Sequence, residues 1–141
     1  MAIQASADEI QAFITGEFPQ ATITVESVDE HETWVRQPVD ESHLRPGGTV
    51  SGPTMMATAD TAAYVAVLSH IGIVPLAVTS NLNINFLRKP AAGKALVAKG
   101  TLLHLGRRSI LTEVNIYSEG HLEKPVAHAV VTYAIPSSHK T

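Results

Sequence analysis

The stretch that decides the fold, residues 51–71, reads SGPTMMATADTAAYVAVLSHI. After Pro53 it holds no glycine or proline, and most of its residues are Ala, Met, Leu, Val or Thr, which predicts one continuous helix. Ser51 is typical of an N-cap, Pro53 fits the first turn, and Gly72 supplies the stop. We therefore expect a helix over about 52–71.

The predicted helix is apolar on nearly all sides, so the rest of the chain must cover it almost completely. Its one formally charged side chain is Asp60, and no other lies between Arg45 and Arg88. An unpaired buried carboxylate costs several kcal/mol of desolvation, so Asp60 needs a partner or a water-accessible pocket. Asp60 is therefore the predicted chemical centre. The alternative is an ordinary helix-surface carboxylate that faces solvent.

The residues before this helix predict a shorter helix, a hairpin and a loop. Ser6 and Glu9 have the spacing of a capping box in front of a short amphipathic helix. Apolar and polar residues alternate at 21–26 and again at 32–35, which is typical of two paired strands. Residues 38–48 hold two prolines and two glycines, so we expect them to form a loop that leads into the long helix.

The residues after the helix change to a period of two, which is typical of strands. Over 78–87, Leu82 and its apolar neighbours at alternate positions share one face, whereas Thr79 lies with the asparagines on the other. An antiparallel meander is the simple interpretation of the rest, because turn residues separate the runs. Three further strand-like runs follow, at 95–105, 109–117 and 125–135.

The order of the predicted elements is short helix, hairpin, long helix and four strands. This order is typical of an α+β domain in which a sheet packs against a helix. It resembles the hotdog arrangement, in which an antiparallel sheet of five or six strands wraps around a long central helix. We expect one such domain to span residues 1–141, because a chain of that length can bury about two-thirds of its surface around one core.

Composition narrows the possible partners and surroundings. Hydrophobic residues make up 45% of the chain, charged residues 16%, and the formal net charge is −3, so nothing indicates a nucleic acid partner. The sequence has no cysteine, which excludes disulfides and thiolate catalysis and favours a reducing cytoplasm. Polar residues interrupt the apolar stretch and no export signal is visible, so we expect no membrane span.

The start of the long helix offers a second chemical group. The first N–H groups of a helix point outward at the positive end of its dipole, and Gly52 lets a ligand come close. Such a site can hold an oxyanion, although plain capping by Ser51 explains the same residues. Gly52 and Asp60 are eight residues apart, which is about 12 Å along one helix. If both act on one substrate, they must come from two subunits, which predicts a dimer with shared sites.

The remaining candidate groups give weaker signals. The seven histidines show no spacing typical of metal ligands, so we expect no metal site, and we expect no cofactor. Basic side chains near predicted turns could contact a phosphate-bearing ligand, the alternative being ordinary solvated charges. These residues are Arg88, Lys89, Arg107 and Arg108.

Residues 45–62, RPGGTVSGPTMMATADTA, resemble the helix start of the hotdog acyl-CoA thioesterases of the phenylacetic-acid-degradation branch. Residues 81–90, NLNINFLRKP, look like their next strand. The resemblance implies that the Gly52 N–H polarises a thioester carbonyl and that Asp60 of the partner subunit serves as base or nucleophile. It also implies an acyl-CoA substrate, hydrolysed to the free acid and CoA, and a homodimer or a dimer of dimers.

Three positions depart from the pattern of that family, which has an Asn and then His-Gly-Gly before the helix. Arg45, Ser51 and Pro53 replace the Asn, the His and the second Gly. Arg45 and Ser51 thus stand where relatives orient the acyl group and the water, and Thr61 and Thr79 are further candidates for positioning that water. The alternative function is a hotdog module that binds an acyl-CoA or acyl-carrier ligand without turnover.

Overall fold

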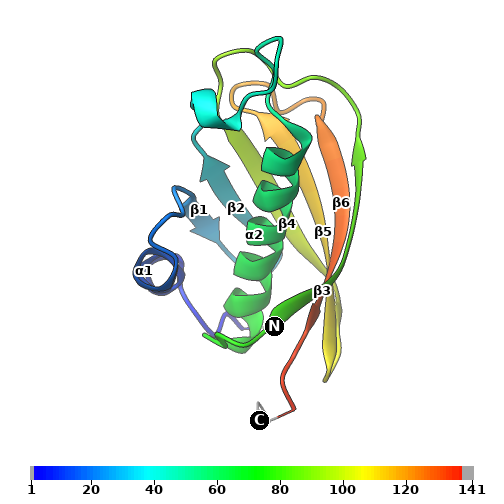
Figure 1. The fold of residues 1–141 in the computed structure, drawn as a ribbon. Coiled ribbons are helices and arrows are strands. Elements are labelled where there is room, and N and C mark those ends of the chain that lie inside the picture. Colours follow the sequence, from blue (N-terminus) through cyan, green and yellow to red (C-terminus); the bar gives the residue numbers. More distant parts are fainter. Residues whose placement is uncertain (1, 138–141) are drawn as a thin grey trace.

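The computed structural model describes residues 2–137 and contains a six-stranded sheet with two α-helices (Figure 1). The long helix has the bounds that the sequence predicts. In chain order the elements are α1 (Ala7–Glu17), β1 (Thr24–Val28), β2 (Glu32–Gln37), a 3-10 turn η1 (Glu41–His43), α2 (Gly52–Ile71), β3 (Val78–Phe86), β4 (Leu96–Leu105), β5 (Ser109–Ser118) and β6 (Ala127–Ala134).

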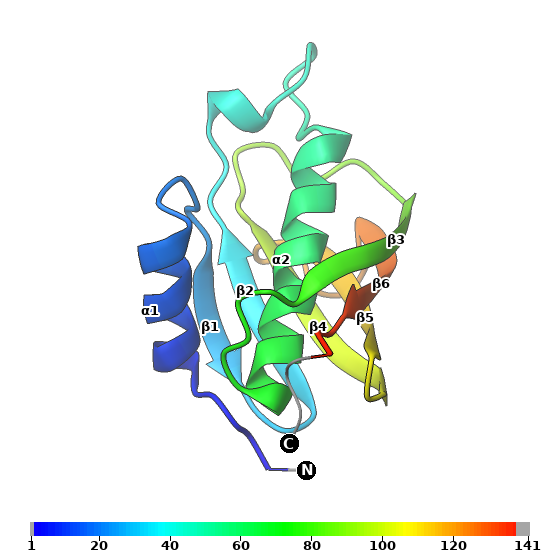
Figure 2. The ribbon, with the colours of Figure 1, turned by 60° about the horizontal axis from the view of Figure 1, so that its bottom comes forward.

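The sheet curves around α2 and runs in the order β1-β2-β4-β5-β6-β3, with every neighbouring pair antiparallel (Figure 1). Helix α1 lies beside β1, at the edge of the sheet farthest from β3 (Figure 2). This is the expected hotdog arrangement, with six strands. None of the helices in residues 2–137 is long and apolar enough to cross a membrane.

Helix α2 is fixed at both ends and packed closely against the sheet. The Ser51 hydroxyl accepts a hydrogen bond from the Thr54 N–H at 3.3 Å, and Gly72, at a φ of 87°, ends the helix by donating to the Leu68 carbonyl at 2.8 Å. In the middle of the sheet, a Cβ on Gly100 of β4 would lie only 3.1 Å from the Ala62 carbonyl oxygen. The close approach requires glycine in the strand, and it holds the middle of α2 in one place.

The short helix, the hairpin and the loop that the sequence predicts before α2 are confirmed. Ser6 and Glu9 form both hydrogen bonds of the capping box, at 3.1 and 3.0 Å. Strands β1 and β2 pair as a hairpin, although β1 begins at Thr24, three residues after the predicted start at 21. The loop over 38–48 contains the single turn η1.

Strand β3 differs from the simple expectation in its partner and in its register. It lies at the sheet edge and pairs with β6, so only β4, β5 and β6 form the meander. A bulge at Ser80 separates the pairs Thr79–Tyr133 and Asn81–Thr132. The extra residue turns Thr79 to the inner face that also carries Leu82, so their predicted placement on opposite faces is wrong.

Candidate functional site

Asp60 is half-buried at the middle of α2, and its Oδ1 atom accepts hydrogen bonds from two hydroxyl groups. The Thr79 hydroxyl donates from β3 at 2.6 Å, and the Tyr133 hydroxyl donates from β6 at 2.9 Å. Each donor reaches the carboxylate because β3 and β6 are paired and the bulge turns Thr79 inward. The lone carboxylate of the helix therefore has two neutral partners and no cationic one within residues 2–137.

Tyr133 is the site residue that the sequence reasoning missed. Its side chain is buried and its ring stacks on that of Tyr64, with centroids 5.4 Å apart and planes at 16°. Burial raises the pKa of the Tyr133 phenol, and the negative charge of Asp60 raises it further. The hydroxyl therefore keeps its proton and acts as a donor. Tyr133 reaches Asp60 because it lies opposite Thr79 in the pairing of β6 with β3. That strand pairing joins segments far apart in the sequence, so no local pattern indicates the role of Tyr133.

A cavity of about 460 Å³ lies beside Asp60. Its walls are mainly apolar and come from α1 and the segment that follows it, from α2, from the start of β3 and the segment before it, and from β6. Thr79, whose hydroxyl donates to the carboxylate, and Thr61 also line it. The cavity can therefore hold an apolar group in contact with one carboxylate. Its lining residues are Ile14, Phe18, Ala21, Asp60, Thr61, Tyr64, Pro75, Ala77, Val78, Thr79 and Tyr133.

Gly52 begins α2, and its N–H donates to no acceptor within the described part of the chain. It is the one open donor of the first three helical residues, because Pro53 has no N–H and the N–H of Thr54 bonds to Ser51. The Phe86 ring lies above it, and a Cβ on Gly52 would be 3.4 Å from the ring. The distance of about 12 Å along the helix keeps this donor away from Asp60 of the same chain.

The other predicted positioning residues lie apart from one another. Thr61 lines the cavity and donates its hydroxyl to the Ala57 carbonyl at 3.0 Å. Ser51 caps the helix and its hydroxyl lies 2.8 Å from that of Thr54. Arg45 is exposed in the loop before the helix. Thr79 is thus the one residue of this predicted set that contacts Asp60.

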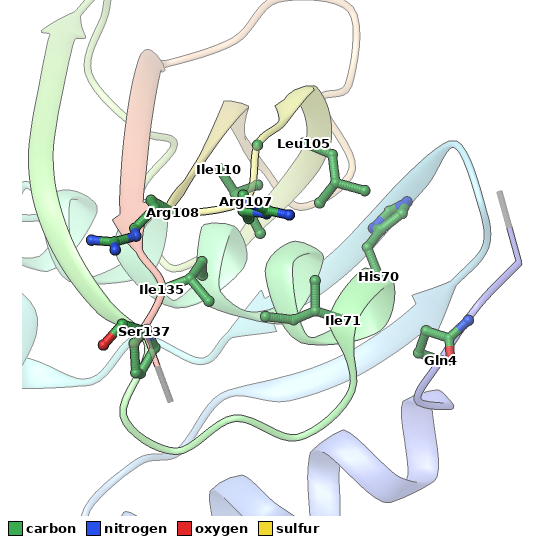
Figure 3. Close-up of a pocket in the computed structure, with 11 residues that line it drawn as sticks. Gln4, His70, Ile71, Leu105, Arg107, Arg108, Ile110, Ile135 and Ser137 are labelled. Atoms are coloured by element: carbon green, nitrogen blue, oxygen red, sulfur yellow. The ribbon is translucent and has the colours of Figure 1, made fainter. Parts of the chain in front are cut away.

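The four predicted phosphate-binding residues form two pairs at opposite ends of α2. Arg88 and Lys89 follow β3, whose last residue, Phe86, packs against the helix start. Arg107 and Arg108 lie in the β4–β5 turn and line a cavity of about 740 Å³ at the other end. Figure 3 shows Arg107 and Arg108 above the last turn of α2, which carries Ile71, and Ile135 lies below Arg108 in this view. A single chain does not bring the four together.

No cluster of three or more His, Asp or Glu side chains in residues 2–137 could hold a metal ion. His70 is buried and its Nδ1 atom lies 2.8 Å from the Ala66 carbonyl oxygen. His128 contacts Glu113 at 2.8 Å. These two histidines therefore have structural partners, and His139 lies outside the described residues.

Comparisons with known proteins agree on one family. The model of the thioesterase superfamily matches residues 47–124. A candidate thioesterase from a Silicibacter species has 41% identity and a TM-score of 0.88, over 96% of this chain and 95% of that one. The PaaI protein of the Escherichia coli phenylacetic acid degradation operon has 25% identity and a TM-score of 0.76, over 91% and 92%. A variant of the phenylacetic acid degradation protein PaaI from Thermus thermophilus has 26% identity and a TM-score of 0.70, over 89% and 99%. No curated protein matches the sequence. The chain belongs to the thioesterase superfamily.

Proposed function

We propose that this protein hydrolyses an acyl-CoA thioester at a site shared between two copies of the chain. Gly52 of one subunit and Asp60 of the other would face the same thioester. The observation that carries the proposal is the geometry of α2: one carboxylate that lines a mainly apolar cavity, and one open N–H about 12 Å away on the same helix. The resemblance of residues 45–62 to the acyl-CoA thioesterases of the phenylacetic-acid-degradation branch supports an acyl-CoA as the substrate, and PaaI proteins of phenylacetic acid degradation are among the similar structures.

In the proposed reaction, the Gly52 N–H donates a hydrogen bond to the thioester oxygen as negative charge develops on it, and the helix dipole adds to this stabilisation. Asp60 of the partner either takes a proton from the attacking water or attacks the carbonyl carbon itself. In the first route, the water adds to the carbonyl carbon. In the second route, Asp60 forms an acyl-aspartyl anhydride, which a water then hydrolyses. In both routes the carbon–sulfur bond breaks, the CoA thiolate leaves and takes up a proton from the water, and the free acid and the Asp60 carboxylate are released. The cavity beside Asp60 would receive the acyl group.

Strand β3 supports the proposed pairing of two copies. It is an edge strand, so its backbone groups on one side have no partner in the sheet. Val78 is 56% exposed and Phe86 49% exposed, which leaves apolar surface on either side of the site. A second copy that covers this strand would also enclose Thr79, which is exposed in the single chain. We propose a homodimer through this surface, with a dimer of dimers as the larger assembly.

In the proposed dimer, the two pairs of basic residues lie at different distances from the thioester. Because Phe86 contacts Gly52, the subunit that supplies the Gly52 N–H brings Arg88 and Lys89 to the same end of the site. We propose that this pair contacts the phosphates of CoA. Arg107 and Arg108 remain a second candidate, next to the larger cavity at the far end of α2.

The test is to measure CoA release from a panel of acyl-CoA thioesters by the wild type and by Asp60→Asn. The proposal expects turnover of at least one thioester and its loss in the variant. Equal rates for the two proteins would refute the catalytic role of Asp60. Thermal stabilisation by acyl-CoA without any product release would instead support a binding module.

A further inference from the structure

We propose that Tyr133 is a positioning residue, which together with Thr79 holds the Asp60 carboxylate so that its Oδ2 atom is the oxygen that acts on the substrate. The inference rests on the proposed thioester hydrolysis and goes beyond it. It assigns a function to a residue outside the predicted set and chooses between two chemically equivalent oxygens.

The hydrogen bonds at Asp60 are unequal. Both hydroxyls donate to Oδ1, at 2.6 Å from Thr79 and 2.9 Å from Tyr133, and no donor within residues 2–137 reaches Oδ2. The Tyr133 hydroxyl also lies 3.2 Å from the Asp60 main-chain carbonyl oxygen, so it is fixed to the helix backbone as well. The lone pairs of Oδ2 are therefore the ones available to a water or a thioester carbon.

Two donors on one oxygen restrict the rotation of the carboxylate. The terminal torsion of an aspartate side chain is soft, so an unrestrained carboxylate would present either oxygen over a wide range of angles. Hydroxyls from two paired strands remove this freedom before substrate arrives, and preorganisation of this kind lowers the barrier of the chemical step. Positioning thus affects kcat more than KM.

Tyr133 is itself held in place. The side chain is 4% exposed, its ring stacks on Tyr64, and the strand that carries it lies between β5 and β3. Because burial and the nearby carboxylate both raise the pKa of its phenol, Tyr133 remains a donor. It therefore orients the carboxylate and does not compete with it as a base.

The decisive variant is Tyr133→Phe, which removes the hydroxyl and leaves the ring to stack on Tyr64. We expect kcat to fall about tenfold with KM within about twofold of the wild type, because one hydrogen bond to a charged group is lost. Thr79→Val has a similar effect, and Thr79→Ser, which keeps a hydroxyl, restores most of kcat.

The matched control is Tyr117→Phe, which removes a phenol hydroxyl in β5, where the ring stacks on Trp34 away from Asp60. This variant should keep the wild-type kcat and KM. Thermal unfolding of all variants tests whether they are folded. If Tyr133→Phe matches the active wild type in kcat, or changes only KM, this inference is refuted while the proposed function stands. A wild type that hydrolyses no thioester refutes the proposed function and this inference together.

Discussion

Replacing Gly52 with proline removes one hydrogen-bond donor from the proposed oxyanion site and leaves the helix in place. Proline is favoured in the first turn of a helix, where its missing N–H has no helical acceptor. The residue before a proline must be extended, and Ser51 already has φ −73° and ψ 153°. Gly52→Pro should therefore fold, with a free energy of unfolding within about 1 kcal/mol of the wild type.

The expected kinetic loss follows from the absence of a substitute donor. Pro53 has no N–H, and the N–H of Thr54 is bonded to Ser51, so no neighbour in the first turn can replace the lost group. Removal of a single oxyanion donor typically lowers kcat by about 10² to 10³, or ~3 to 4 kcal/mol of transition-state stabilisation. We expect a loss of this size for Gly52→Pro.

The assay is steady-state CoA release, measured for the wild type, Gly52→Pro and Gly52→Ala, with thermal unfolding as the check on folding. Gly52→Ala keeps the N–H and adds a Cβ 3.4 Å from the Phe86 ring, so it controls for added bulk near the ring. It should lose less kcat than the proline variant. A folded Gly52→Pro protein whose kcat stays within about twofold of the wild type would refute the oxyanion role.

Three further predictions concern the core, the interface and the nucleotide end. Leu68→Ala removes a fully buried side chain from α2 and should lower the free energy of unfolding by about 2–5 kcal/mol in urea titrations, and no loss would contradict the packing. Val78→Glu places a charge on the exposed edge strand and should shift sedimentation from dimer to monomer, whereas an unchanged dimer would exclude β3 as the interface. Replacing Arg88 and Lys89 together with alanine should raise KM for acyl-CoA severalfold and leave KM for a short thioester without nucleotide unchanged; equal KM changes would exclude phosphate contact.

The sequence predicts the central helix well because its signals are local. Ser51 and Gly72 are a cap and a stop that act within one turn of the helix ends, and both work as expected. The apolar composition of residues 52–71 also correctly predicts that the rest of the chain must cover this helix on nearly all sides. Asp60 is conspicuous for the same reason, as a single charge in a long uncharged segment.

The surroundings of Asp60 depend on non-local pairing, which alternation along one strand does not encode. Thr79 faces Asp60 because of a bulge at Ser80, and a one-residue bulge reverses the expected face. Tyr133 meets them because β3 pairs with a strand about fifty residues later in the chain. The sequence also does not show that the pair Arg88 and Lys89 lies far from the pair Arg107 and Arg108. Their separation depends on the folded sheet, which places the β4–β5 turn at the end of α2 opposite the helix start.

The central claim is that Gly52 and Asp60 act on one thioester from different subunits, and mixing two inactive variants tests it most directly. A heterodimer of Gly52→Pro and Asp60→Asn chains has one site with both wild-type groups and one site with neither. Random pairing of equal amounts should restore about a quarter of wild-type activity, since half of the dimers are mixed and each has one intact site. If the mixture stays as inactive as the separate variants, although native mass spectrometry detects the mixed dimer, the shared site is contradicted.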